Sequence, residues 1–163
     1  MQQAHHAQGE ALTLNAALVG RTYPPTSPYV VGREKVREFA TAIGDANPAY
    51  HDVDAARALG YSDVVAPPTF AFVIAYAGSS QAAMDPELGL DYSRVVHGEQ
   101  RFSYSRPIVA GDALVATATI EAIRAVAGND ILTTRVDLST ESGEHVVTTT
   151  TVIVARGTAE ESA

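Results

Sequence analysis

The sequence predicts an α+β domain in which an antiparallel sheet of about five strands wraps around one long buried helix. Two features lead to this prediction. A segment of helical length that begins near Thr69 is apolar on all sides. The half of the chain that follows it contains β-branched or alternating runs with turn residues between them and no helical pattern. A chain of 163 residues, 46% of them hydrophobic, has the size of one such domain.

The first elements are expected to be one short helix and one short strand. Leu14, Ala17 and Leu18 have helical spacing, which ends at Gly20. The prolines that follow force an extended path into a strand at residues 29–31.

Two helices are expected on either side of a polar turn. Residues 33–43 place their apolar side chains on one stripe, and a glycine follows them. Asn47 precedes a proline and favours a turn, while Asp52 is a good N-cap for a helix over residues 53–59.

The buried helix is expected to begin at Thr69, because the preceding Pro67 and Pro68 suit a first helical turn. Residues 70–77 contain no polar side chain other than a tyrosine hydroxyl. A helix of this kind is enclosed on nearly every side, and a sheet wrapped around it is the simplest enclosure.

The sheet is expected to form from successive strands without intervening helices, which favours an antiparallel meander. The last run is apolar on both faces and is predicted to be a central strand. The predicted strands are Val95–Tyr104, Ala113–Ile123, Asp130–Leu138 and His145–Ala155.

The domain is expected to cover residues 14–156. Residues 1–13 are polar and aperiodic, which predicts a disordered arm, and residues 157–163 predict a flexible acidic tail. No signal peptide or membrane-spanning segment is expected, because no apolar run is long enough.

Composition narrows the classes of partner and cofactor. Eleven basic and nineteen acidic residues give a net charge of −8, which disfavours nucleic acid as a partner. The absence of cysteine excludes disulfides and thiol chemistry and fits a cytoplasmic protein. The histidines do not have metal-type spacing, so neither a metal nor a cofactor is expected.

The chemically rich stretch of the chain is the polar turn at residues 44–52. Asp45, Asn47, Tyr50 and His51 place a carboxylate, an amide, a phenol and an imidazole within seven residues. Such residue types also recur in turns and caps for backbone reasons, so local chemistry alone does not establish a site.

Several motifs together resemble one protein family over nearly the whole chain. They are Gly44-Asp45-Ala46-Asn47-Pro48, Leu59-Gly60-Tyr61, Val64-Val65-Ala66-Pro67-Pro68-Thr69-Phe70, Val95-Val96-His97-Gly98-Glu99-Gln100 and Arg106-Pro107-Ile108-Val109-Ala110-Gly111-Asp112. The set is similar to the hot-dog fold of the MaoC-like (R)-specific hydratases and dehydratases. More narrowly, it resembles the N-terminal-type domains, including the A-type subunits of actinobacterial (R)-3-hydroxyacyl-ACP dehydratases.

The resemblance implies elimination of water from a 3-hydroxyacyl thioester. This reaction needs a base for the C2 proton, an acid for the 3-hydroxyl, and donors for the thioester oxygen. In active relatives an aspartate and a histidine of the G-D-x-N-P-x-H turn handle the proton and the water. A backbone N–H of a glycine where the buried helix begins holds the carbonyl, as suits a helix N-terminus.

The chain departs from this pattern at two places. Tyr50 stands where the family has its histidine, and His51 comes one residue later. Pro68 stands where active members have the glycine, and proline has no N–H to donate. Two losses in one mechanism favour a subunit that does not itself catalyse.

The resulting hypothesis is the non-catalytic, substrate-accommodating half of a heterodimeric (R)-3-hydroxyacyl-thioester dehydratase in fatty-acid elongation. A second hot-dog subunit would supply the intact dyad, and the substrate would be an acyl-CoA or acyl-ACP. The alternatives are a homodimeric enoyl-thioester hydratase that uses Asp45 and His51 as catalytic residues, and a thioester-binding module without catalysis.

Two groups of residues are candidates for contact with the substrate. The arginines are candidates for the phosphopantetheine or an acidic carrier protein: Arg33, Arg37, Arg101 and Arg106. The expected substrate-binding residues lie in the turn and on the buried helix: Asn47, Tyr50, Thr69, Phe70, Phe72, Val73 and Tyr76.

Overall fold

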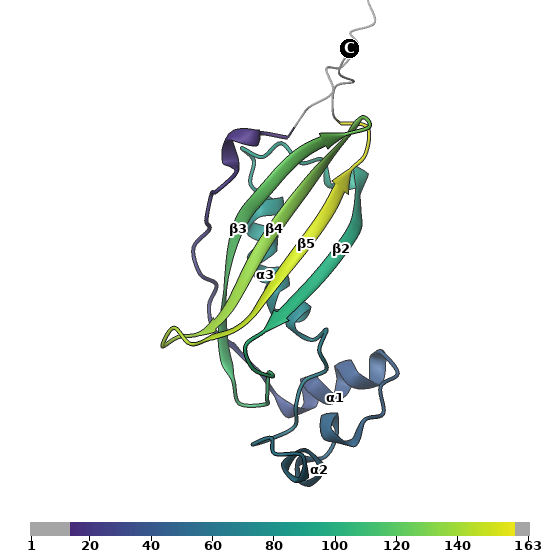
Figure 1. Ribbon diagram of the computed structural model, residues 1–163, viewed down its shortest axis with the longest axis vertical. Coiled ribbons are helices and arrows are strands. Elements are labelled where there is room, and N and C mark those ends of the chain that lie inside the picture. The colour runs from purple at the N-terminus through teal and green to yellow at the C-terminus, as the bar shows by residue number, and fades with distance from the viewer. Residues whose placement is uncertain (1–13, 159–163) are drawn as a thin grey trace, which may run out of the picture.

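A five-stranded antiparallel sheet curls around the helix α3 (Ala71–Ala83) in the computed structural model, which describes residues 14–158 (Figure 1). The strand order is β1-β3-β4-β5-β2. This confirms the predicted α+β architecture and the number of strands. The strands are β1 (Tyr29–Val30), β2 (Val95–Tyr104), β3 (Ala113–Val126), β4 (Asn129–Thr140) and β5 (His145–Ala155).

The predicted four-strand meander is wrong for β2. Strands β3, β4 and β5 pair in succession, but β2 joins the far edge, where Val96 pairs with Val154 and Tyr104 with Val147. The free edge of β3 is occupied instead by β1, which pairs Tyr29 with Leu114. The chain therefore passes from one edge of the sheet to the other between β2 and β3, and β5 lies in the interior of the sheet as expected.

Helices are found at the three places where the sequence predicts short ones, and their ends agree within one to three residues. Two further 3₁₀ turns, over Pro48–Tyr50 and Tyr92–Arg94, were not predicted as helices. Helices α1 and α2 extend beyond one end of the sheet, which places the polar turn between them at that end (Figure 1). Within residues 14–158 no helix is long and apolar enough to cross a bilayer. The elements are η1 (Ala16–Leu18), α1 (Arg33–Ala42), η2 (Pro48–Tyr50), α2 (Val53–Ala58) and η3 (Tyr92–Arg94).

The main core lies between α3 and the concave face of the sheet. Alternate residues of β3 and β4 are fully buried there, as the period-two pattern predicts. Phe70 caps the N-terminal end of the helix and packs edge-on against Phe39 of α1 and Tyr29 of β1. These aromatic contacts join the start of α3 to the elements that carry the polar turn.

Helix α3 is buried or half-buried along most of its length, and two of its residues are exposed. Its buried residues are Ala71, Ile74, Ala75, Gly78 and Ala82, whereas the side chain of Tyr76 is 51% exposed and Ala77 is exposed. The expected enclosure therefore holds for most of the helix and fails at Tyr76 and Ala77, which the sheet of one chain leaves at the surface.

The predicted arm at residues 1–13 lies outside the described residues, as does most of the predicted tail. Two residues of that tail belong to the fold. The N–H of Gly157 donates to Asn129, and Thr158 is buried, with its hydroxyl donating to the carbonyl of Ala155.

Gly78 allows α3 to approach the sheet closely. A Cβ atom at this position would lie 3.1 Å from the Cβ of Ala116 on β3 and 3.2 Å from Cγ1 of Val136 on β4. Both distances are shorter than ordinary van der Waals contact, so the residue at position 78 sets the distance between helix and sheet.

We expect Gly78→Leu to lower the free energy of unfolding by about 1–3 kcal/mol, because a larger side chain forces the helix off the sheet. Urea denaturation followed by circular dichroism measures this change. The matched control is Ala77→Leu on the exposed side of the same helix, which should change stability by less than about 0.5 kcal/mol. Equal effects of the two substitutions would contradict the close approach.

Candidate functional site

The polar turn is held by its own side chains. Asp45 Oδ1 accepts a hydrogen bond of 3.1 Å from the N–H of Asn47, and Asn47 Oδ1 accepts one of 3.0 Å from the N–H of Ala49. Gly44 begins the turn with φ of 74°, a left-handed conformation that suits glycine. Because Asn47 uses its oxygen as the cap of η2, its Nδ2 amide remains available to a ligand.

His51 is folded back onto the turn. Its Nε2 lies 3.0 Å from the carbonyl oxygen of Asp45, and its own carbonyl accepts a hydrogen bond of 2.7 Å from Nε of Arg37. The contact between the two predicted catalytic residues is therefore made to the backbone of Asp45 and not to its carboxylate.

A cavity of about 330 Å³, called the main cavity below, lies beside the turn. The turn, the segment that leads into α3, the end of β2 and the loop after it all contribute to its wall. Asp45 and His51 are not among its lining residues. The wall is formed by Asn47, Ala49, Tyr50, Leu59, Tyr61, Val65, Ala66, Pro68, Tyr104, Ser105, Arg106, Pro107 and Ile108.

The ionisable side chains of this wall are three tyrosines and one arginine. Partial burial, followed by the nearby charge of Asp45, raises the pKa of Tyr50. Burial raises the pKa of Tyr104 to about 12, and its hydroxyl donates a hydrogen bond of 2.6 Å to the carbonyl of Pro68. Both phenols are protonated at neutral pH, because an undisturbed tyrosine already has a pKa near ~10.

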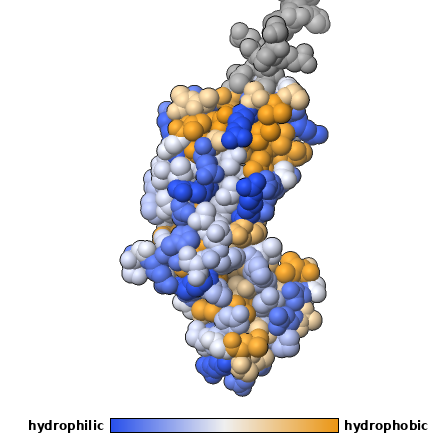
Figure 2. Space-filling view, viewed as in Figure 1, coloured by the Kyte–Doolittle hydropathy of each residue, from blue (hydrophilic) through white to orange (hydrophobic). Residues whose placement is uncertain are grey.

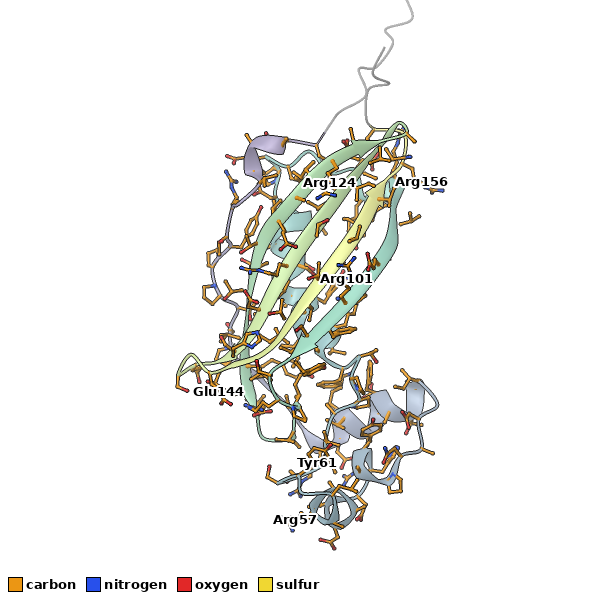
Figure 3. The ribbon with its side chains drawn as sticks, in the orientation of Figure 1. Arg57, Tyr61, Arg101, Arg124, Glu144 and Arg156 are labelled. Carbon is orange, nitrogen blue, oxygen red and sulfur yellow. The ribbon has the colours of Figure 1, made fainter. Side chains whose placement is uncertain are left out.

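Arg106 is fully engaged by the protein. Its guanidinium forms two bonds to Asp112, of 2.9 and 3.0 Å, and bonds of 2.7 and 3.4 Å to Glu144, and it also donates to the carbonyl of Pro107. The hydrogen bonds to both carboxylates raise its pKa further above the ordinary value. Glu144 in the β4–β5 turn and Tyr61 are labelled at this end of the sheet in Figure 3.

The segment that leads into α3 presents a carbonyl to the cavity wall at Pro68, which has no N–H. Thr69 is exposed and does not belong to the lining. Among residues 14–158, the N–H of Thr69 meets no hydrogen-bond acceptor.

Comparison with known proteins agrees with the fold and the family that the sequence motifs resemble. A profile of the FAS1-like, dehydratase domain region matches residues 17–149. The chain is 62% identical to a UPF0336 protein of Streptomyces coelicolor over 149 residues, which are 91% of this chain and 99% of that protein. It is 52% identical to a UPF0336 protein of Saccharopolyspora erythraea over 150 residues, which are 92% of this chain and 96% of that protein.

Two solved structures are also similar. A MaoC-like dehydratase has 41% identity and a TM-score of 0.80, covering 86% of this chain and 42% of that longer chain. This chain therefore spans less than half of that protein. The truncated HadBC (3R-hydroxyacyl-ACP dehydratase) complex from Mycobacterium tuberculosis has 32% identity and a TM-score of 0.76, covering 84% of this chain and 96% of that one.

This chain belongs to the MaoC-like hydratase and dehydratase family. The structure brings Asn47 and Tyr50 of the polar turn together with Pro68 at one cavity. Tyr50, which the resemblance places at the histidine position, lines this cavity, whereas His51, one residue later, does not.

The predicted substrate-binding residues of α3 divide between the core and a second cavity. Phe70 is fully buried, and the half-buried Val73 packs against the main core. Phe72 and Tyr76 line a cavity of about 70 Å³ between α3 and the strands β2, β4 and β5. The ring of Phe72 also packs edge-on against His97.

The remaining candidate arginines are also paired with carboxylates. Their partners are Asp63 for Arg33, Glu34 for Arg37 and Glu99 for Arg101. Within the described residues, no group of three or more histidine, aspartate or glutamate side chains could hold a metal ion.

Among the polar residues of the main cavity, sequence reasoning missed Tyr61, Tyr104 and Ser105 as site residues. Tyr61 lies within one of the quoted motifs and Ser105 directly precedes another, but only the fold shows that the end of β2 meets the polar turn. A polar residue at the end of a predicted strand is a weak signal by itself.

The pair of Arg33 and Asp63 joins α1 to the segment that leads to the cavity wall. Hydrogen bonding to Arg33 is the main cause that lowers the pKa of Asp63 from 3.8 to about 2. The charged carboxylate therefore stabilises the folded state fully above pH 3.8, and this contribution is lost as the pH falls through about 2.

We expect Asp63→Asn to destabilise the protein at pH 7 and to lose this effect progressively on acidification below pH 3.8. Urea midpoints of the variant and the wild type, measured at pH 7 and pH 3, test this. Asp54→Asn is the control, because Asp54 is exposed and lies 3.8 Å from its partner Arg57. A pH-independent difference for Asp63→Asn would contradict the role assigned to this pair.

Proposed function

We propose that this chain is the substrate-accommodating, non-catalytic half of a heterodimeric (R)-3-hydroxyacyl-thioester dehydratase that acts in fatty-acid elongation in the cytoplasm. The observation that carries the proposal is the chemistry of the main cavity wall. Among the described residues, this wall contains no carboxylate and no imidazole. It therefore offers shape and hydrogen bonds to a thioester, but no group that takes a proton at neutral pH.

The dehydration needs two functions that the family motif normally supplies. A base removes the C2 proton, and a donor stabilises the negative charge that develops on the thioester oxygen. Here the base position holds the phenol of Tyr50, and the donor position holds the carbonyl of Pro68. Loss of one oxyanion donor alone costs about 10²–10³ in rate, so the two changes together support a subunit without its own activity.

The partner would be a second hot-dog subunit that carries the intact G-D-x-N-P-x-H turn. The HadBC relative is a complex of this fold, which supports such a partner. In this chain β2 is the outer strand of the sheet, and large apolar side chains are exposed beside it: Tyr76, Tyr92 and Val96. An edge strand next to exposed aromatic residues is a surface that a partner can cover.

The ligand of the cavity would be the thioester end of an acyl-CoA or acyl-ACP. The free Nδ2 amide of Asn47 is suited to a thioester or pantetheine oxygen, and Leu59, Val65 and Ile108 are suited to apolar atoms. Because Arg106 is already bound by two carboxylates, we assign it to holding the wall in place and not to binding phosphate.

We expect the purified chain alone to hydrate a short 2-enoyl-CoA at a rate close to background. Loss of the absorbance of the enoyl thioester measures this rate. Robust hydration that disappears in both Asp45→Asn and His51→Ala would overturn the proposal in favour of a self-sufficient homodimer. Binding of the thioester without activity, and without any complex on co-expression with a dyad-bearing MaoC-like subunit, would favour a binding module.

We further expect the double variant Tyr50→His and Pro68→Gly to gain hydratase activity. The substitutions place an imidazole and a backbone N–H at the two deficient positions, and general acid–base groups contribute ~10²–10⁴ in rate. The matched control is Tyr61→His with Pro68→Gly, which adds an imidazole to the same wall outside the turn. Equal gains in both double variants would contradict the specific role of position 50.

A further inference from the structure

A chain of polar side chains begins at the rim of the main cavity and is not used by the proposed dehydratase role. Ser105 follows β2, is exposed and belongs to the cavity lining. Its Oγ lies 2.6 Å from Nδ1 of His145, the first residue of β5. Nε2 of the same imidazole lies 2.9 Å from the hydroxyl of Thr148, which donates a bond of 2.6 Å to Oδ1 of Asp137.

The direction of each hydrogen bond follows from the chemistry of the groups. An ionised carboxylate only accepts, so Thr148 donates to Asp137. The oxygen of Thr148 then accepts from Nε2–H of His145, which leaves Nδ1 as the acceptor in the neutral ring. Ser105 must therefore donate its hydroxyl proton to Nδ1. All three bonds point from the serine toward the carboxylate.

Hydrogen bonds that run in this direction, from a serine through an imidazole toward a carboxylate, are found at activated serines. A serine nucleophile needs a neutral imidazole that accepts its proton and a third group that fixes the tautomer of the ring. Asp137 Oδ1 is 4.0 Å from Nε2 of His145, and Thr148 bridges the two. The carboxylate is thus close enough to stabilise the imidazolium that would form.

We propose that Ser105 is a nucleophile that accepts the acyl group of a thioester held in the main cavity, with His145 as its base. Thr148 and Asp137 are positioning residues that hold the imidazole in the required tautomer. The substrate class is acyl thioesters, and the reaction is slow thioester hydrolysis through an acyl-serine. The thioester part of this inference rests on the function proposed above, whereas the nucleophile rests on the hydrogen-bond chain alone.

The reaction is balanced in two steps. Ser105 Oγ bonds to the thioester carbonyl carbon while its proton passes to His145 Nδ1; the carbon–sulfur bond then breaks, and the departing thiolate takes the proton. Water attacks the acyl-serine in the same way, releasing a carboxylic acid and the serine. The Nδ2 amide of Asn47, in the same cavity wall, is the available donor for the carbonyl oxygen.

A tagged fluorophosphonate tests the nucleophile without any thioester, because it labels activated serines. We expect the intact chain to be labelled at Ser105, as mapped by fragmentation mass spectrometry. Labelling should fall about 10²-fold or more in Ser105→Ala and His145→Ala. Ser103→Ala is the matched control, because Ser103 is an exposed serine of β2, two residues before Ser105, and is not bonded to any imidazole of the described residues. Wild-type protein without label at Ser105 would overturn the proposal.

Release of CoA from a short acyl-CoA tests the thioester step. The chain has no cysteine, so a thiol reagent detects only the released CoA. We expect release to depend on Ser105, to fall in Thr148→Val and on acidification, and to be restored in Thr148→Ser, which keeps the hydroxyl. A merely structural role of Thr148 would give a pH profile that does not change among these variants.

The two assays separate the failure of this inference from that of the proposed function. Label at Ser105 together with CoA release supports both parts. Label without release supports the nucleophile and overturns acyl transfer from a thioester, and it leaves the proposed function to the enoyl-CoA and co-expression tests above. CoA release that persists in Ser105→Ala overturns Ser105 as the acyl acceptor and leaves the binding of thioesters supported.

Discussion

The close packing of α3 on β3 and β4 at Gly78 is the constraint on which the rest of the structure depends. Because glycine at this position faces Ala116, the helix axis lies near the sheet, and the strands can curl around it. The side of α3 that faces away from this contact is exposed at Tyr76. The outward face of the sheet is mostly hydrophilic along its middle, with apolar residues toward the end opposite α1 and α2 (Figure 2).

Within the described residues, the wall of the main cavity is well bonded and contains no carboxylate and no imidazole. Arg106 and Tyr104 both donate their hydrogen bonds to partners in the protein, so neither requires a ligand as a hydrogen-bond partner. Such a wall binds by shape and by a few free donors. The two proposals use separate parts of it: the polar turn and Pro68 concern a dehydration completed by another chain, while Ser105 at the rim concerns transfer of the acyl group.

Sequence reasoning predicted the elements and the family well, because proline, glycine and period-two patterns act locally. It did not predict that β2 pairs with β5, since pairing depends on how the sheet curls around α3 and on β1 occupying the edge of β3. At the site, Asn47 and Tyr50 were predicted by motif, whereas Ser105 and His145 are forty residues apart and meet only through strand register. The exposed side of α3 was missed because an apolar pattern does not distinguish burial in one chain from burial between chains.

At Pro68 the segment before α3 presents a carbonyl, which accepts a hydrogen bond, where other helix starts present an N–H, which donates one. It is an acceptor, and the hydroxyl of Tyr104 already occupies it. An anionic inhibitor that imitates the enolate of the dehydration therefore finds no hydrogen-bond donor for its negative charge at this position. Compounds of that kind that act on active members of the family would be expected to discriminate against this chain, so resistance to them would require no change in its sequence.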